Sequence, residues 1–221
     1  MTLPRNDVSS GILDELDNFR ALLLSLNVAE WETPSRCEGW TVAGVASHVV
    51  GSMADVVAGN LDGLGTPEVT AREVAERAGR SPAELADECA SVRDASKDLL
   101  EVFDDDAWDA PAPGGYDGTL GDGVEALWYD TFLHADDIRA AIGRPTEITD
   151  GLRASLSHLA TVLDHRGWGP ATLAFAGQPR FDIGGGGAEI TGDPFEFVLA
   201  ATGRLDPAKL GLDERVDVYR D

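Results

Sequence analysis

The feature that most constrains the fold is a series of long segments whose apolar residues recur at helical spacing. The first segment covers residues 9–26. Its apolar stripe consists of Ile12, Leu16, Phe19, Leu23 and Leu26. Similar stripes cover residues 41–64, 81–103 and 124–142, and a further one runs from near Thr149 to residue 167. Stripes of this period are typical of amphipathic helices that pack on a common core, so the sequence predicts a helical bundle.

Capping residues mark where several of these helices begin. Ser9 or Ser10 is a candidate cap for the first helix, and Thr41 is a good N-cap for the second. Two pairs have the spacing of a capping box, Thr70 with Glu73 for a short helix and Ser81 with Glu84 for the third long helix. The fourth long helix is expected to stop at Gly143 and Pro145.

The composition changes after Trp168. The segments ATLAFAG (171–177) and AEITG (188–192) resemble short strands, and FDIGGGG (181–187) between them resembles a flexible turn. A last helix is expected from Asp193. We therefore predict a mainly α fold with two domains, a metal-binding helical bundle over residues 1–167 and a small C-terminal α+β domain over residues 168–221.

Charge and composition exclude several classes of function. The chain of 221 residues carries a formal net charge of −23, and such a surface repels nucleic acid and anionic lipid. No apolar segment approaches the roughly 18 residues needed to span a bilayer, and the first residues lack the pattern of a signal peptide. Two cysteines do not make a disulfide framework. We expect a soluble cytoplasmic protein without nucleic-acid or membrane partners, and its oligomeric state stays open.

An acid and a histidine interrupt the apolar stripe of the fourth long helix. Asp130 and His134 are four residues apart, so their side chains lie on one face, together with apolar residues such as Leu127 and Ile138. Burying an acid there costs several kcal/mol unless it is paired or bound to metal. The pair is either a hydrogen bond within the core or part of a metal site.

His48 favours the metal site. It lies at the border of the apolar face of the second helix, with the small residues Gly44 and Ser52 one turn away on either side. One carboxylate and two imidazoles are a ligand set that suits zinc or another divalent ion and leaves a coordination position open. Asp137, one turn past His134, would either orient a ligand or be an exposed acid near the helix end.

Three motifs resemble one known family. TPSRCEGWTVAGVASHVVG (33–51), DTFLHADDIRAAIGRP (130–145) and ITGDPFEFVLAATGR (190–204) are similar, in this order, to segments of the actinobacterial mycothiol-dependent maleylpyruvate isomerase family. This family lies within the DinB-like superfamily. The resemblance implies a DinB-like four-helix bundle, a divalent metal near one end, and a small C-terminal lobe.

The resemblance also implies roles for single residues. The metal ligands would be His48, Asp130 and His134, and the catalytic arginine of the C-terminal segment would be Arg204, for which helix capping is the alternative. The isomerase has a glutamate where this chain has Asp130, so the metal would lie closer to this helix or be bound through water. Cys37 belongs to the first motif, and its neighbours of opposite charge favour a packed, structural cysteine.

Three functions remain open at this point. The first is a metal-dependent isomerase or thiol transferase that uses mycothiol on a small electrophilic substrate. The second is a metal-dependent hydrolase or specialised biosynthetic enzyme on the same scaffold. The third is a non-catalytic metal-binding or stress protein. The sequence does not identify the substrate, because fold and site type do not fix a reaction.

Overall fold

The computed structural model describes residues 3–220, which divide into two units. The first unit runs from Pro4 to Thr149, and the second runs from Asp150 through Arg220 and includes Leu3. Helix α8 (Gly151–His165) lies in the second unit. The sequence analysis assigned this helix to the first domain because its apolar stripe continues the helical pattern, and the composition changes only after it.

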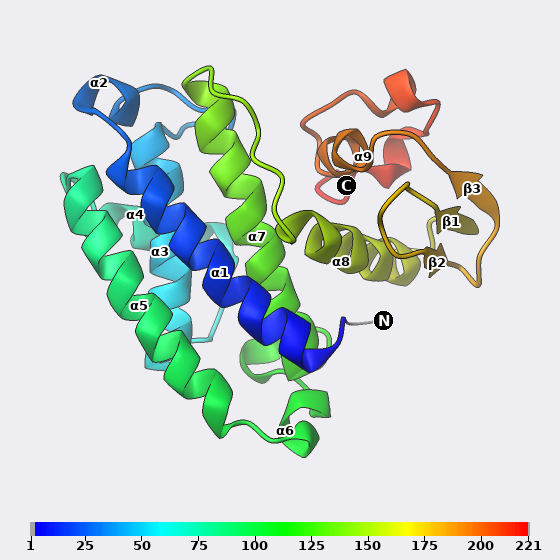
Figure 1. The fold of residues 1–221 in the computed structure, drawn as a ribbon, viewed down its shortest axis with the longest axis horizontal. Coiled ribbons are helices and arrows are strands. Elements are labelled where there is room, and N and C mark those ends of the chain that lie inside the picture. The colour runs from blue at the N-terminus through cyan, green and yellow to red at the C-terminus, as the bar shows by residue number, and fades with distance from the viewer. Residues whose placement is uncertain (1–2, 221) are drawn as a thin grey trace. The chain divides into compact units, whose positions relative to one another are not determined.

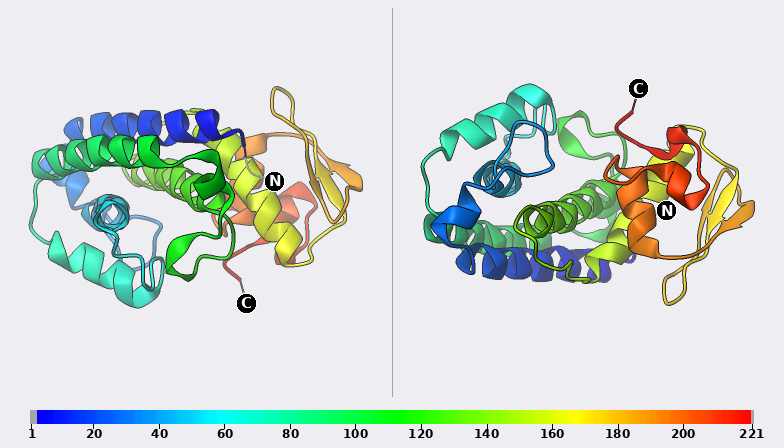
Figure 2. Two further views of the ribbon diagram at one scale, coloured as in Figure 1. Left: turned by 90° about the horizontal axis from the view of Figure 1, so that it is seen from below. Right: turned by 90° about the horizontal axis from the view of Figure 1, so that it is seen from above.

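Four long helices build the first unit, namely α1 (Arg5–Leu24), α3 (Val42–Ala58), α5 (Pro82–Val102) and α7 (Leu120–Ala141). Helix α1 packs against α5 and α7, and α3 packs against the same two helices (Figure 1). Figure 2 shows α1 and α5 running side by side. The predicted four-helix bundle is therefore confirmed. Shorter elements connect the long helices: α2 (Val28–Trp31), α4 (Pro67–Glu76), α6 (Asp105–Asp109) and the 3-10 turn η1 (Pro113–Gly115).

Local capping explains where most of these helices begin. Thr41 caps α3, and Ser81 with Glu84 forms the capping box of α5, as predicted. Two predictions are wrong. Helix α1 begins at Arg5, before the serines proposed as its cap. Helix α4 begins at Pro67 with Thr66 as its N-cap, because this Thr-Pro pair supplies both a capping oxygen and a first-turn proline. Glu73 therefore lies in the middle of α4 and is not part of a capping box.

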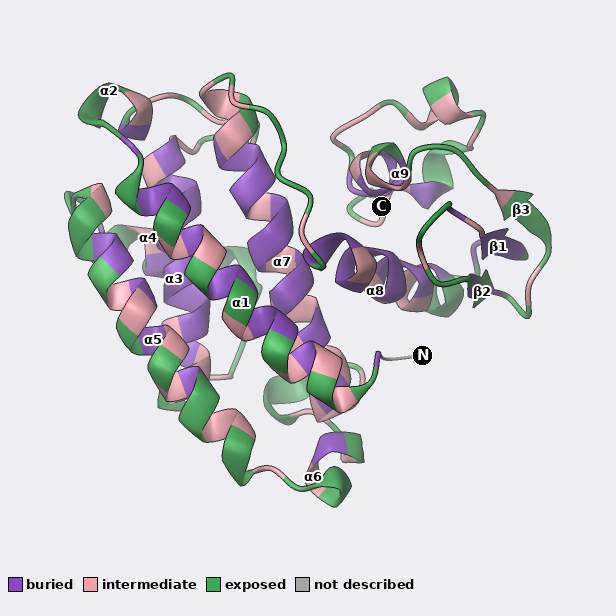
Figure 3. Cartoon of the chain, in the orientation of Figure 1, coloured by how far each residue is buried: buried purple, intermediate pink, exposed green. Residues whose placement is uncertain are grey.

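The core of the bundle lies between the long helices. In Figure 3 the outer sides of α1 and α5 are exposed and their inner sides are buried. Large side chains such as Phe19, Trp128 and Phe132 are almost fully buried. Gly11 lets α1 approach α7 closely, because a Cβ at this position would lie 2.1 Å from Cη2 of Trp128.

One carboxylate lies inside this core. Glu15 is 3% exposed and accepts hydrogen bonds from Nε1 of Trp128 (3.4 Å) and Oγ1 of Thr149 (2.6 Å). Burial raises the pKa of Glu15, and the two hydrogen bonds offset only part of this effect. Protonation of Glu15 is therefore easier in the folded protein than in the unfolded chain. The contribution of Glu15 to stability is present at low pH and is lost as the pH rises through its folded-state pKa.

Glu15→Gln is therefore expected to raise the free energy of unfolding at pH 8, by on the order of 1 kcal/mol. The gain should shrink towards pH 5, where wild-type Glu15 binds its proton more readily. Urea unfolding at several pH values measures this difference. Asp14→Asn, at the exposed neighbouring position, is the control and should show no such trend. A gain from Glu15→Gln that stays constant with pH would contradict the prediction.

The second unit combines helices with a small sheet. The strands are β1 (Ala171–Leu173), β2 (Phe181–Ile183) and β3 (Ala188–Ile190), in the order β2-β1-β3. Strand β1 is antiparallel to β2 and parallel to β3. Helix α9 (Pro194–Ala201) follows, one residue after the predicted start and with Asp193 as its N-cap, and then the 3-10 turns η2 (Pro207–Leu210) and η3 (Glu214–Val216).

One segment of this unit differs from the prediction. FDIGGGG was expected to be a flexible turn, but its first three residues form β2. Phe181 and Ile183 are buried and Asp182 between them is exposed, so this short strand has the alternation of a half-buried edge. Across both units, no described helix combines the length and the hydropathy needed to cross a bilayer.

Candidate metal centre

The structure brings three of the predicted site residues together between α3 and α7. Nε2 of His48 on α3 lies 3.6 Å from Oδ2 of Asp130 on α7. Nε2 of His134, one turn further along α7, lies 3.4 Å from Oδ1 of the same carboxylate. One donor atom from each residue falls within 4.8 Å of the others. These atoms are close enough to bind one ion between them.

The two imidazoles are held at an angle that points both Nε2 atoms towards Asp130. Their ring centroids are 5.2 Å apart and their planes are perpendicular. Trp40 fills the space that Gly44 leaves beside His48. A Cβ on Gly44 would lie 3.1 Å from Cβ of Trp40. The centroids of the indole and of the His48 ring are 5.3 Å apart. Asp130 keeps 29% of its side-chain surface exposed, so the donor set is open on that side.

Each imidazole is also held from behind by a buried carboxylate. Nδ1 of His48 donates to Oε2 of Glu73 (2.9 Å), and Nδ1 of His134 donates to Oδ2 of Asp137 (2.8 Å). Histidines that bind metal usually donate their second ring N–H in this way, which fixes the tautomer that leaves the Nε2 lone pair free. The donor set and its supports therefore fit a divalent ion such as zinc.

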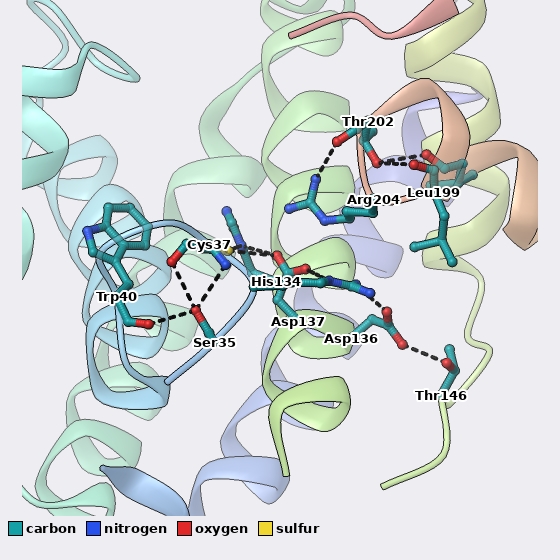
Figure 4. Close-up of polar contacts among 12 residues, drawn as sticks. Ser35, Cys37, Trp40, His134, Asp136, Asp137, Thr146, Leu199, Thr202 and Arg204 are labelled. Carbon is teal, nitrogen blue, oxygen red and sulfur yellow. Dashed lines mark hydrogen bonds and ion pairs between the residues drawn. The ribbon is translucent and has the colours of Figure 1, made fainter. Parts of the chain in front are cut away.

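Asp137 belongs to a network that ties a loop to α7. It is completely buried, so the alternative of an exposed acid at this position is wrong. Arg36 forms ion pairs with Asp137 and with Asp136, and Oγ1 of Thr146 donates to Asp136 at 2.6 Å. Figure 4 shows this row of side chains running from His134 to Thr146. The network fixes the carboxylate that orients His134.

Cys37 lies in the same loop, beside the network. Its Sγ donates to Oδ2 of Asp137 at 3.2 Å and lies 3.9 Å from Nδ1 of His134. Ser35 and Trp40 close the loop around it, with Oγ of Ser35 donating to the carbonyl of Trp40 at 2.9 Å (Figure 4). The half-buried thiol packs against the supporting carboxylate.

Comparisons with known proteins identify the family of this chain. The family model of the mycothiol maleylpyruvate isomerase N-terminal domain matches residues 12–139. This range is more than half of the chain and contains His48, Asp130 and His134. The chain belongs to this family. A comparison with curated proteins finds no significant match in sequence.

Two solved structures resemble this member of the mycothiol maleylpyruvate isomerase family. They are crystal structures of the mycothiol-dependent maleylpyruvate isomerase and of a mutant of it in which alanine replaces a histidine. Each matches with a TM-score of 0.62 at 19% sequence identity, over 92% of this chain and 90% of the other. At this identity the likeness shows the fold, and the predicted fold class is confirmed.

The charges of the candidate centre stabilise one another. Burial alone would raise the pKa of Asp130, but the two imidazoles beside it hold that pKa below its usual range. Burial alone would lower the pKa of His48 and of His134, but Asp130 and the supporting carboxylates raise both. A metal ion would replace protons on the imidazoles, so its binding releases protons into solution.

Arg204, the remaining predicted site residue, follows α9 in the second unit. Its side chain is half-buried, and Nη1 donates to the backbone carbonyl of Thr202 at 3.1 Å. Thr202 is the C-cap residue of α9, so this contact is one that a capping cation makes.

Glu73 is the site residue that the sequence analysis missed. It lies four residues after Val69 and four before Arg77, on the side of α4 that faces α3. No apolar stripe marks it in the sequence, because the burial of Glu73 depends on the packing of α4 against α3. The sequence analysis placed Glu73 in a capping box instead.

Proposed function

We propose that this protein is a divalent-metal-dependent enzyme that uses mycothiol on a small electrophilic substrate, as an isomerase or a thiol transferase. The observation that carries the proposal is the donor set of His48, Asp130 and His134, with both imidazoles held by carboxylates and with an exposed side at Asp130. Membership of the family supports the choice of thiol, because the related enzyme of known structure is described as mycothiol-dependent.

In this proposal His48, Asp130 and His134 hold the ion, and the donor set suits zinc. When bound, such an ion acts as a Lewis acid that favours the thiolate form of a thiol over the thiol itself. Glu73 and Asp137 keep the imidazoles in the tautomer that binds metal. Arg36 keeps Asp137 in place by an ion pair. Arg204 is the candidate catalytic residue of the second unit, because the segment that contains it resembles the C-terminal segment of the family.

The chemistry of a thiolate with an electrophilic alkene has two outcomes. The sulfur adds to one carbon of the double bond, and the resulting single bond allows rotation. If the thiolate is then expelled, the double bond returns in the other geometry, the thiol is regenerated and the reaction is an isomerisation. If a proton is taken up instead and the C–S bond is kept, the reaction is a thiol transfer.

The test is incubation of the zinc-loaded protein with maleylpyruvate, with and without mycothiol, followed by proton NMR. Conversion to the trans isomer that requires both zinc and mycothiol is the expected result for an isomerase, and a stable thioether indicates a transferase. Glutathione serves as the control thiol. Conversion that does not depend on thiol, or hydrolysis of added esters or amides, would contradict the thiol mechanism and favour the hydrolase.

A second measurement separates an enzyme from a binding protein. Cobalt-substituted protein is expected to gain a near-ultraviolet sulfur-to-cobalt absorption band when mycothiol is added. Strong thermal stabilisation by metal, without such a band and without any effect of substrate, would favour the non-catalytic metal-binding or stress protein.

A further inference from the structure

The carboxylate of Glu73 stands out among the charges around the candidate centre. Glu73 is 1% exposed, and its Oε2 accepts a 2.9 Å hydrogen bond from Nδ1 of His48. Within the described part of the chain, Oε1 is buried and has no hydrogen-bond partner. A buried carboxylate with a single partner costs free energy, so something else must compensate its charge.

The nearest cation does not provide this compensation. Arg77 lies one turn further along α4, but its Nη1 donates to the backbone carbonyl of Glu73 (3.1 Å) and its Nη2 donates to Glu88 (2.7 Å). Among residues 3–220, His48 is the one basic side chain that pairs with the Glu73 carboxylate.

The packing that buries Glu73 is built into α3. A Cβ on Gly51 would lie 2.7 Å from Cβ of Glu73 and 2.8 Å from Nη1 of Arg77. A residue with any side chain at this position would push α4 away from α3. Glycine therefore allows the carboxylate to reach the back of the His48 ring.

The corresponding carboxylate behind His134 is in a different electrostatic state. Asp137 is just as buried, but Arg36 forms an ion pair with it. The charge of Asp137 is thus neutralised within the protein. Among residues 3–220, the charge of Glu73 is paired only with the His48 ring.

We propose that Glu73 is a positioning residue that strengthens metal binding through His48 by means of its uncompensated charge, whereas Asp137 mainly orients His134. The inference rests on the proposed metal site. A divalent ion on Nε2 polarises the imidazole, and the buried anion at Nδ1 stabilises the positive charge that spreads onto the ring. The interaction is strong because no solvent screens it.

The experiment compares three variants in their affinity for zinc. Glu73→Gln keeps the shape and an acceptor for Nδ1 but removes the charge, and Asp137→Asn makes the same change behind the other imidazole. Glu76→Gln changes an exposed acid of the same helix and is the control. The dissociation constant is measured by competition with a chromophoric chelator at one pH and ionic strength. The thermal midpoint of each metal-free protein is measured in parallel.

We expect Glu73→Gln to weaken zinc binding by about 10- to 100-fold, more than Asp137→Asn does, whereas Glu76→Gln leaves the affinity unchanged. The metal-free Glu73→Gln protein should melt no lower than the wild type, because the substitution removes an uncompensated buried charge. Glu73→Asp, which restores the charge, should recover part of the lost affinity.

A merely structural role predicts a different pattern. Glu73→Gln would then melt lower or fail to fold without metal, and either result would contradict the inference. Zinc affinity of Glu73→Gln within about threefold of the wild type, a change below 1 kcal/mol, would also overturn it while leaving the proposed function intact. Wild-type protein that binds no divalent ion would overturn both.

Discussion

Replacing His134 by alanine is expected to leave the protein folded but without bound metal. The variant loses one of three donors and keeps the ion pair of Asp137 with Arg36, so the bundle retains its packing. We expect about one zinc ion per wild-type chain and nearly none per variant chain, with affinity lower by more than about 100-fold. Elemental analysis of protein purified without chelator or nickel measures this directly.

The control for this experiment is another histidine of the same chain. His165 is exposed at the end of α8, so His165→Ala should keep its full metal content. Metal that survives in His134→Ala would mean that the ion binds elsewhere. Wild-type protein that stays metal-free even after reconstitution would leave Asp130 and His134 as a hydrogen-bonded pair at the edge of the core.

The second large effect is expected at Gly11, where α1 packs against α7. A methyl group there would lie 2.1 and 2.2 Å from Cη2 and Cζ2 of Trp128, whose indole is 1% exposed and cannot move without displacing its neighbours. Gly11→Ala should therefore lower the free energy of unfolding by about 3 kcal/mol and the Tm by roughly 10 °C. Differential scanning calorimetry of the metal-free protein measures both quantities.

Gly123 provides a matched comparison. It also lies inside a long helix, but the nearest atoms to a Cβ at this position are 3.9 Å away. Gly123→Ala should raise the stability by about 0.5–1 kcal/mol, because alanine loses less conformational entropy in a helix than glycine does. Equal effects at both positions would show that backbone propensity, and not the contact with Trp128, decides the outcome at Gly11.

Features that depend on neighbouring residues in the chain could be predicted from the sequence. The pairing of Asp130 with His134 follows from one turn of helix, and the caps at Thr41, Ser81 and Asp193 follow from residue types at fixed spacing. The contact of His48 with this pair is long-range. It was predictable because His48 lies at the border of an apolar face, which must pack against the rest of the core.

Features that depend on how elements pack could not be predicted. The position of Glu73 behind His48 requires α4 to fold back against α3, and no local pattern encodes that approach except the small residue at Gly51. The network of Arg36 with Asp136 and Asp137 requires a loop to close over α7. Strand β2 escaped prediction because three residues followed by four glycines carry too little β signal.

The candidate ligands come from α3 and α7, which are separated in the chain by α4, α5 and α6. An ion bound there would link two helices that are far apart in the chain, so the unfolded chain offers no comparable site. Such an ion stabilises the folded state by an amount that grows with the logarithm of its free concentration, about 2.7 kcal/mol at one hundred times its dissociation constant. A shortage of such a metal would therefore lower the level of the protein itself, because a larger fraction of the chains would be unfolded and open to proteolysis.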